Sequence, residues 1–265
     1  MGPYISLTAQ TLTRSKLSVT GETADFMQRT NSEEILDSKD CPPGETQTSL
    51  RDLCRINRWF GGISTTRKLL ERVVSVTCLK RLSLLEVAAG LGEVPRGAAM
   101  RLAGHGVSLD ITDLDRVYSH LQRDHRALAA DALALPFPDA SFDVVSCSLF
   151  VHHLQPDEVR RFTSESLRVS RHALLINDLI RHPLHLALVY AGFPLMRSYV
   201  SRVDGVASVR RAYVPEEMRA MLGDGISSAS KVEISTHYLF RMGIIVWKGA
   251  EANSGPTSSR PINVA

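Results

Sequence analysis

The sequence lacks the cysteine pattern of a metal knuckle or a disulfide framework. Its 265 residues include four widely spaced cysteines: Cys41, Cys54, Cys78 and Cys147. Because no C-x-x-C pair occurs among them, we expect free thiols, a reducing compartment and no metal site. The sequence also has no apolar run of the ~18 residues that a transmembrane helix needs, and no apolar signal-peptide segment near its start. These absences predict a cytoplasmic protein without a transmembrane segment.

The sequence has no marked excess of one charge. Its 31 Lys and Arg stand against 28 Asp and Glu, which gives a net charge of +3. Nucleic-acid-binding proteins concentrate positive charge on one surface, and this sequence shows no basic appendage, aromatic stacking platform or N-P-P-Y-type loop. We therefore expect a small-molecule substrate and no nucleic acid partner. The hydrophobic content of 44% suits one α/β domain of roughly 200 residues with an appendage.

The N-terminal part of the chain has little apolar periodicity. Residues 1–48 are rich in Thr, Ser, Asp and Glu and contain the breaker cluster C-P-P-G at 41–44, so we expect a flexible arm. Apolar residues at helical spacing follow in 49–60 and predict an amphipathic helix. A second helix is expected at 64–76, and the two would form a helical cap at 49–80.

From 81 to 248, short apolar runs alternate with helical patterns, which is typical of a doubly wound parallel sheet. Strands are expected at 84–88, 107–113, 127–130, 142–147 and 173–178, with a final hairpin-like pair at 232–236 and 239–247. Helices should begin at Pro156 and Pro215, because proline fits the first helical position and acidic residues follow it in the first turn. We expect a substrate-side lid at about 180–213 and a disordered tail at 249–265.

The first of these strands leads into a loop of small residues, in the run L-L-E-V-A-A-G-L-G-E-V-P at 84–95. A loop without bulky side chains, followed by a helix N-terminus, lets a ligand approach the backbone closely. The dinucleotide pattern G-x-G-x-x-G does not fit, because its last glycine would fall on Glu93 or Pro95.

This run resembles instead E-x-G-x-G-x-G, the loop that holds the nucleoside and methionine parts of S-adenosylmethionine (SAM) in class I methyltransferases. Glu86, Gly90 and Gly92 match the pattern, and Ala88 departs from it. If the backbone at Ala88 has a positive φ, alanine is strained by about 1 kcal/mol; if it is β-like, the methyl group is harmless. We expect the β-like case.

A second segment carries the resemblance further. The run D-A-L-A-L-P-F-P-D-A-S-F-D-V-V begins at Asp131. It closely resembles D-A-x-x-L-P-F-x-D-x-x-F-D-x-V of methyltransferases related to ubiquinone and menaquinone biosynthesis. The resemblance implies the Rossmann-like methyltransferase fold, a doubly wound, mostly parallel seven-stranded sheet, here with an N-terminal helical extension. It also implies SAM as cofactor, with Asp131 and Ala132 at its adenine. Without the resemblance, Asp131 could be only a turn residue.

Ligands of open parallel sheets bind beyond the carboxyl ends of the strands. The second strand ends in D-I-T-D-L-D at 110–115. Asp113 lies about 20 residues after the glycines, the spacing of an acid that accepts hydrogen bonds from the ribose hydroxyls. Asp110 should point into or across the sheet, and Asp115 should cap the next helix. We add Ser148, at the end of the fourth strand, to the cofactor-binding residues.

The segment S-C-S-L-F-V-H-H-L after the fourth strand supplies two histidines. His153 and His152 are candidate general bases, because imidazole titrates near neutral pH, and Asp178 at the end of the fifth strand is a third candidate. The methyltransferases that the sequence resembles carry H-H-L here in largely structural and pocket-shaping roles. Packing is therefore the alternative role for both histidines.

These features predict SAM-dependent methylation, at oxygen or carbon, of a small acceptor of aromatic, quinol or polyketide-like character. Arginines of the lid could anchor an acidic acceptor or form a solvated basic face: Arg197, Arg202, Arg210 and Arg211. Two alternatives stay open, a nucleic acid methyltransferase and a non-catalytic partner subunit, the latter because of Ala88. A lipidic acceptor would bring transient membrane contact, and the sequence does not determine the oligomeric state.

Overall fold

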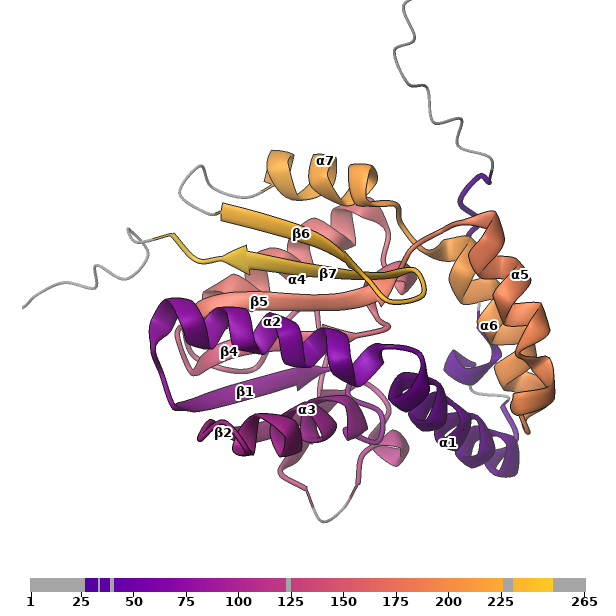
Figure 1. The fold of residues 1–265 in the computed structure, drawn as a ribbon, viewed down its shortest axis with the longest axis horizontal. Helices are drawn as coiled ribbons and strands as arrows, with labels where there is room; N and C mark the ends of the chain where they lie inside the picture. Colours follow the sequence, from indigo (N-terminus) through magenta and orange to yellow (C-terminus); the bar gives the residue numbers. More distant parts are fainter. Residues whose placement is uncertain (1–26, 33, 39–40, 123–124, 226–230, 250–265) are drawn as a thin grey trace, which may run out of the picture.

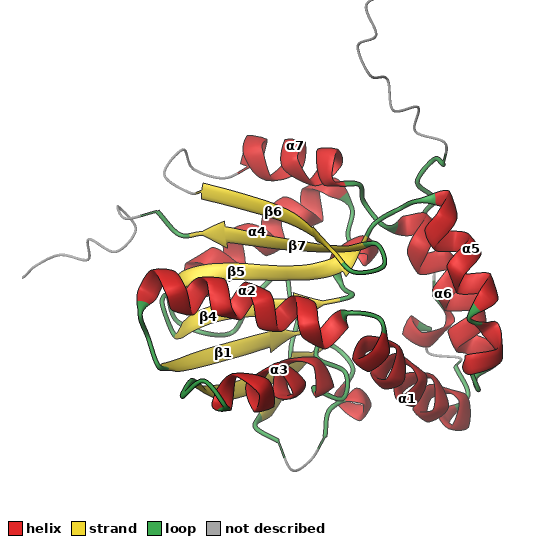
Figure 2. Cartoon of the chain, viewed as in Figure 1, coloured by secondary structure: helices red, strands yellow, loops and turns green. Residues whose placement is uncertain are grey.

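The computed structural model describes residues 27–32, 34–38, 41–122, 125–225 and 231–249. These residues form one sheet with helices on both faces and a further group of helices at one end (Figures 1 and 2). The first 26 residues of the predicted arm and residues 250–265 of the predicted tail lie outside the described part.

The sheet has seven strands in the order β3-β2-β1-β4-β5-β7-β6, and β7 alone runs antiparallel to its neighbours. The strands are β1 (Arg81–Val87), β2 (Ser108–Asp115), β3 (Ala127–Ala129), β4 (Phe142–Ser148), β5 (Ser170–Leu179), β6 (Lys231–His237) and β7 (Arg241–Trp247). The predicted doubly wound, mostly parallel seven-stranded sheet is confirmed. The difference from the predicted strand bounds that matters most for the site is at β2, which continues two residues beyond Asp113.

Both faces of the sheet are covered, which is why its central strands are apolar throughout. The helices α2 (Gly62–Thr77) and α3 (Glu93–Ala103) pack on one face, and α4 (Pro156–Val169) and α7 (Pro215–Gly225) pack on the other. The helix starts at Pro156 and Pro215 agree with the prediction. A capping box between Gln155 and Glu158 reinforces the start of α4 by satisfying backbone N–H groups of the first turn.

A third group of helices lies beyond the carboxyl ends of the parallel strands (Figure 1). It comprises α1 (Pro43–Trp59), α5 (Pro183–Ala191) and α6 (Tyr199–Arg211), with short 3-10 turns η1 (Ile35–Asp37), η2 (Tyr118–His120), η3 (Val151–His153) and η4 (Phe193–Leu195). The Asp52 carboxylate of α1 accepts hydrogen bonds from the backbone N–H groups of Arg197 (2.7 Å) and Ser198 (2.9 Å). These bonds fasten α1 to the start of α6.

The predicted boundary between arm and helical cap is wrong. Helix α1 begins at Pro43 rather than at Ser49, because proline is tolerated in the first helical turn and the breaker cluster therefore starts a helix. The described residues from Met27 to Ser38, here called the N-terminal strap, are also packed. Ile35 and Leu36 donate backbone hydrogen bonds to the Asp204 carboxylate of α6, at 2.8 and 2.9 Å.

Arg29 anchors the other end of the N-terminal strap. Its Nε donates to the carbonyl of Arg211 (2.7 Å), and its Nη2 donates to the carbonyls of His152 (3.1 Å) and Leu154 (3.0 Å). The guanidinium also lies over the ring of Tyr213, 4.2 Å from its centroid, a favourable cation–π geometry. The strap is thus tied to both α6 and the segment that carries the two histidines.

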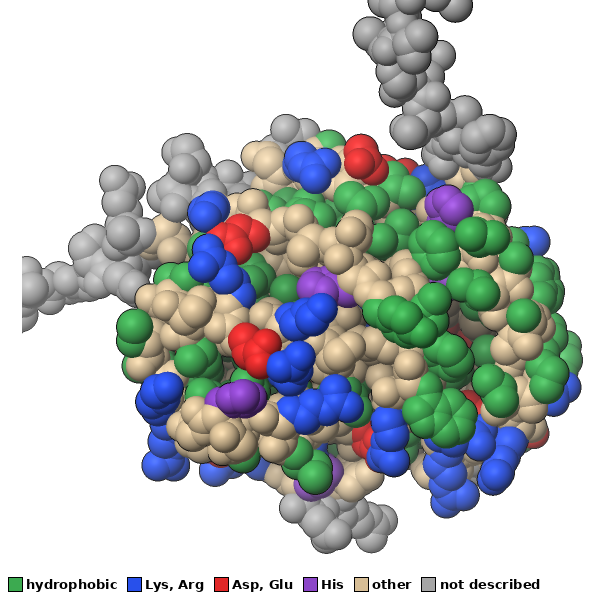
Figure 3. Space-filling model, viewed as in Figure 1, with side chains coloured by type: hydrophobic (Ala, Val, Ile, Leu, Met, Phe, Trp, Pro, Cys, Tyr) green, Lys and Arg blue, Asp and Glu red, His purple; other side chains and the backbone are tan. Residues whose placement is uncertain are grey.

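Much of the apolar run at 184–195 lies on the surface, rather than in a pocket or the core. Leu184 is 59% exposed and Tyr190 48% exposed, and Figure 3 shows hydrophobic side chains over α5. From the same region, His185 and Val189 reach the cavity described below. None of the helices within the described ranges has the length and apolar character needed to cross a bilayer.

Candidate functional site

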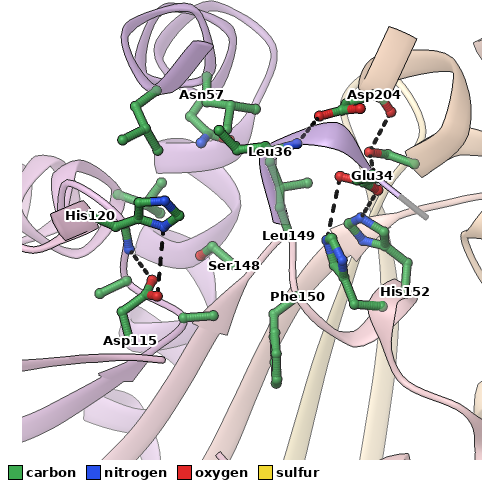
Figure 4. Close-up of a pocket in the computed structure, with 18 of the residues that line it drawn as sticks. Glu34, Leu36, Asn57, Asp115, His120, Ser148, Leu149, Phe150, His152 and Asp204 are labelled. Carbon is green, nitrogen blue, oxygen red and sulfur yellow. Dashed lines mark hydrogen bonds and ion pairs between the residues drawn. The ribbon is translucent and has the colours of Figure 1, made fainter. Parts of the chain in front are cut away.

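A cavity of about 630 Å³ lies at the carboxyl edge of the sheet (Figure 4). On one side it is lined by the loops that follow β1, β2, β3 and β4, including Ala88, Asp115, Ala132 and Ser148. On the other side it is lined by α1, α5, α6 and the N-terminal strap. The cavity therefore joins the glycine loop to the lid, at the edge where open α/β sheets bind their ligands.

The loop after β1 winds through left-handed backbone at alternate residues. The φ angles are +54° at Ala88, +53° at Gly90 and +66° at Gly92. The expectation of a β-like backbone at Ala88 is wrong, and alanine occupies a position that favours glycine. A side chain at Gly92 is excluded by its neighbours, because a Cβ there would clash with Nη1 of Arg96 and would lie 2.7 Å from Oδ2 of Asp113.

Replacing Ala88 with glycine should raise the free energy of unfolding by about 1 kcal/mol, because glycine adopts the positive φ without strain. SAM binding should tighten modestly as the loop is relieved. Ala89→Gly is the matched control: φ at Ala89 is not positive, so added chain entropy should lower the free energy of unfolding instead. Chemical denaturation and calorimetry measure both quantities. If Ala88→Gly destabilises the protein as Ala89→Gly does, the strain does not exist. A gain in SAM affinity of tenfold or more would favour the non-catalytic alternative.

The acid that faces the cavity from β2 is Asp115, and the prediction of Asp113 for this position is wrong. Asp113 is fully buried, and its Oδ2 lies 2.8 Å from Nη1 of Arg96 and 3.4 Å from Nδ1 of His125. Asp115 lines the cavity, and its oxygens accept the backbone N–H groups of Gly90 (3.0 Å) and Val117 (2.9 Å). Because β2 extends two residues further than predicted, the acid at its carboxyl end is Asp115 and not Asp113.

Glu86, near the end of β1, is a buried carboxyl on the cavity wall. Burial raises its pKa to about 7; the Ser146 hydroxyl opposes the shift and the nearby Asp113 adds to it. In the described part of the chain, Oε2 of Glu86 has no hydrogen-bond partner. A buried carboxyl of this kind carries a charge readily once a cationic or hydrogen-bonding ligand lies beside it.

The segment predicted at the adenine lies on the cavity wall. Asp131, Ala132 and Leu133 all line it. Oδ1 of Asp131 accepts the backbone N–H of Leu133 (2.9 Å), which is the bond of a turn residue. Asp131 therefore has the local turn role, and its side chain stands at the cavity as well. Ser148 at the end of β4 lines the same wall.

Two of the three candidate bases, His152 and Asp178, form a hydrogen-bonded ion pair with each other. Nδ1 of His152 lies 2.7 Å from Oδ1 of Asp178, and both side chains are buried. Burial alone would lower the pKa of His152, but the carboxylates of Asp178 and Glu34 outweigh it and raise the pKa to about 10. Burial would likewise raise the pKa of Asp178, which His152 holds below its usual value. Because each of these two groups is the other's partner and Asp178 does not line the cavity, both are less well placed than His153 to take a proton from a ligand there.

Both histidines line the cavity, but the His153 side chain is half-buried whereas that of His152 is buried. Nε2 of His153 lies 3.7 Å from Oε2 of Glu34, and the other carboxylate oxygen, Oε1, lies 3.4 Å from Nε2 of His152 (Figure 4). Glu34 is fixed by the Ser208 hydroxyl, which donates to Oε1 (2.8 Å). Of the three predicted catalytic residues, His153 is the most accessible to a ligand in the cavity.

Sequence reasoning missed Glu34 and Arg241, which both line the cavity. Glu34 carried no signal, because it was assigned to a flexible arm. Arg241 opens β7 and is buried, donating to Oδ1 of Asn57 (2.8 Å); a lone arginine at the start of an apolar strand could have marked it. Among the predicted lid arginines, Arg211 lines the cavity, and its Nη2 donates to the carbonyl of His153 (2.9 Å).

We compared the chain with known protein families, curated sequences and solved structures. Residues 85–173, about a third of the chain, match a family described as a methyltransferase domain. None of the curated protein sequences matches the chain significantly.

Several solved structures are similar in fold. The plantazolicin methyltransferase BpumL in complex with SAH has a TM-score of 0.60 at 12% identity, over 81% of this chain and 94% of that chain. The plantazolicin methyltransferase BamL, with a triazolic desmethylPZN analog and SAH, has a TM-score of 0.59 at 12% identity, over 78% and 91% of the chains. A SAM-dependent methyltransferase from Aquifex aeolicus has a TM-score of 0.45 at 16% identity, over 67% and 88%. The first two confirm the Rossmann-like methyltransferase fold.

Proposed function

We propose that the chain is a class I SAM-dependent methyltransferase that methylates a small aromatic, quinol or polyketide-like molecule at oxygen or carbon, a proposal that the methyltransferase-domain match at 85–173 supports. The observation that carries it is the continuous cavity, which runs from the glycine loop to the wall formed by Glu34 and His153. Kinship with the ubiquinone and menaquinone enzymes is part of the proposal and rests on the D-A-x-x-L-P-F-x-D-x-x-F-D-x-V likeness alone.

The residues around the glycine loop fit SAM. The orphaned Oε2 of Glu86 suits the cationic methionine end, and Asp115 stands at the end of β2 with its carboxylate on the cavity. A carboxylate with two oxygens has capacity for the ribose hydroxyls beyond the two backbone N–H groups that it already accepts. Asp131 and Ala132 would contact the adenine, and the positive φ at Gly90 lets the backbone approach the ligand.

The protein's share of the chemistry is alignment, exclusion of water and control of a proton. SAM, when bound, supplies an activated methyl group together with its leaving group, so no catalytic triad is needed. The loops after β1 and β4 would hold the cofactor end of the cavity, while α1, α6 and the N-terminal strap shield the acceptor end from water. His153 is the side chain that would act on the acceptor, as a proton acceptor or as a ligand.

The volume favours a small acceptor over a nucleic acid. A cavity of about 630 Å³ must hold the acceptor together with the cofactor, and cavities of this size bind small molecules. The apolar lining from Leu50, Leu53 and Val189 favours an acceptor with an apolar body. Arg241 and Arg211 could receive an acidic group at the far end.

We expect SAM to bind more tightly as the pH rises through about 7, because ionised Glu86 attracts the cationic ligand and its protonated form does not. Below that pKa, affinity should change by up to about tenfold per pH unit. Calorimetry on either side of pH 7 measures this slope, and Glu86→Gln should abolish it. An unchanged slope in Glu86→Gln would assign it to another group, Asp113 being the nearest acid.

The raised pKa of Glu86 also determines how the free energy of unfolding changes with pH. Folding raises the pKa of Glu86 from 4.5 to about 7, so the folded state keeps a proton that the unfolded chain releases. Its contribution to stability is present below pH 4.5 and is lost as the pH rises towards about 7.

The function is tested by incubating the purified protein and SAM with a panel of phenols, quinols, alkylresorcinols and pyrones. A mass shift of one CH₂ in an acceptor, with stoichiometric S-adenosylhomocysteine (SAH), is the expected result. Filter binding to tRNA and rRNA at moderate salt tests the nucleic acid alternative. Absence of SAM and SAH binding would support the non-catalytic alternative and would contradict the proposal.

A further inference from the structure

Three metal-ligating side chains converge on the acceptor side of the cavity. They are Glu34 of the N-terminal strap and the two histidines of η3, His152 and His153, and their ligand atoms all lie within 4.8 Å of one another. Nε2 of His152 is 3.4 Å from Oε1 of Glu34, and Nε2 of His153 is 3.7 Å from Oε2 (Figure 4). Ligands about 2 Å from a tetrahedral cation are separated by distances of this order.

His152 and Asp178 are arranged like a metal-bound histidine and the carboxylate that holds its second ring nitrogen. Nδ1 of His152 is occupied by Asp178 at 2.7 Å, so Nε2 is the nitrogen turned towards Glu34. A carboxylate on the far nitrogen of a ligating histidine fixes the ring and increases its basicity. Nε2 itself is buried and makes no hydrogen bond in the described part of the chain, and its ion-pair contact is Oε1 of Glu34 at 3.4 Å.

The charges of the cluster favour a cation. The carboxylates of Glu34 and Asp178 are both buried, and their ion pairs are with the histidines of η3. With neutral imidazoles, the two carboxylates carry two negative charges in a low-dielectric site, which a divalent ion would neutralise. Protonation of His152 would neutralise only one of them. The nearby guanidinium groups of Arg29 and Arg211 are turned to the backbone carbonyls of the two histidines rather than to the carboxylates.

We propose that Glu34, His152 and His153 form a binding site for a divalent transition-metal cation, with an open coordination position towards the cavity. Two imidazoles and one carboxylate favour Zn²⁺ and its neighbours over Mg²⁺ or Ca²⁺, which prefer oxygen ligands. Both His153 and Glu34 line the cavity, so a fourth ligand can come from there. No spacing in the sequence marks such a site, because Glu34 and the histidines are brought together only by the fold.

The role of the cation rests on the proposed function. An acceptor hydroxyl bound at the open position would lose its proton to water more readily, because the cation stabilises the oxygen anion. A lone pair of that oxygen then forms the new bond to the methyl carbon, and the electrons of the breaking carbon–sulfur bond pass to sulfur. His153 would therefore be a ligand of the cation rather than a free base.

Direct metal titration tests the site. Chelator-treated, dialysed protein is titrated with Zn²⁺ by calorimetry and with Co²⁺ by visible absorption, in the absence of acceptor. One equivalent of Zn²⁺ should bind in the micromolar range or tighter, and Co²⁺ should give the absorption of a low-coordinate nitrogen–oxygen site. Glu34→Gln and His153→Ala should each weaken binding by at least about tenfold.

The control is His105→Ala, which removes an exposed histidine far from the cluster in sequence and should leave Zn²⁺ affinity unchanged. SAH affinity within about twofold of the wild type shows that each variant is folded. If Glu34→Gln and His153→Ala bind Zn²⁺ as tightly as the wild type, the metal is adventitious and the proposal is overturned. It is equally overturned if the wild type binds no Zn²⁺, in which case His152 is an imidazolium held between two carboxylates.

The two proposals fail separately. Methyl transfer at an unchanged rate by metal-free protein would overturn the role of the cation and leave the methyltransferase function standing. Specific Zn²⁺ binding in a protein that methylates no acceptor would overturn the proposed function and leave the metal site standing.

Discussion

Replacing His153 with alanine is expected to lower kcat by ~10²-fold or more while leaving SAH affinity within about twofold. The side chain lines the cavity beside Glu34, on the wall proposed to receive the acceptor, so its loss should affect the reaction and spare cofactor binding. Raising the pH should partly restore the variant, because more of a phenolic acceptor ionises unaided. Steady-state kinetics and calorimetry with SAH measure the two effects.

His152→Ala is the contrasting variant. It leaves Asp178 buried without its imidazole partner, while Glu34 keeps His153 and the Ser208 hydroxyl, and breaking a buried ion pair costs about 3–5 kcal/mol. Thermal or chemical denaturation should therefore detect the His152 substitution, whereas His153→Ala should change stability little. If His153→Ala loses SAH binding or solubility in parallel with rate, His153 is a packing residue, as H-H-L is in the methyltransferases that the sequence resembles.

Replacing Asp115 with alanine is expected to weaken SAM and SAH binding by about 1 to 3 kcal/mol, because hydrogen bonds from two ribose hydroxyls to a charged acceptor are lost. Asp115→Asn keeps one acceptor oxygen without the charge and should give an intermediate loss. Calorimetry on both variants measures the effect. Asp115 also holds the N–H groups of Gly90 and Val117, so stability should be measured alongside affinity.

Asp113→Ala should give the opposite pattern. Its carboxylate is buried against Arg96, so the free energy of unfolding should fall by about 3 kcal/mol or more, with SAH affinity changed less than in Asp115→Ala. Affinity losses that are equal in the two variants, or larger for Asp113→Ala, would contradict the assignment of Asp115 to the cofactor.

Most of the fold could be predicted because the central strands are buried on both faces, which makes them continuous apolar runs that stand out in a sequence. Helix starts were predictable where proline and acidic residues coincide, as at Pro156 and Pro215. The same proline signal was misinterpreted at Pro43, because a cluster of breakers indicates a loop as readily as a helix start.

Local motifs were enough to predict several residues of the cavity wall. Glu86 and Gly90 belong to β1 and the loop after it, and Asp131 belongs to the loop after β3. Asp113 was the wrong acid, because in D-I-T-D-L-D nothing in the sequence shows where pairing with the neighbouring strand ends. Ala88 was predicted to be β-like because alanine avoids positive φ, and here the loop imposes +54°.

The acceptor side could not be predicted, because tertiary contacts alone bring it together. His152 and His153 are adjacent in sequence and look equivalent, yet the turn of η3 buries one against Asp178 and leaves the other at the cavity. Glu34 reaches them only because Asp204 and Arg29 hold the strap in place. No local pattern encodes such a contact.

The placement of Arg241 has a consequence for biosynthesis on the ribosome. The acceptor wall uses Glu34, among the first described residues to be translated, and Arg241, in the last strand of the sheet. Until β7 emerges, β5 has no partner on that side and the wall lacks its buried arginine. A nascent chain can assemble the cofactor loops early, since β1, β2 and β4 are by then complete. The wall formed by Glu34 and Arg241 is therefore complete only after β7 has been made, and a chain released before β7 would have an incomplete cavity and an exposed strand edge.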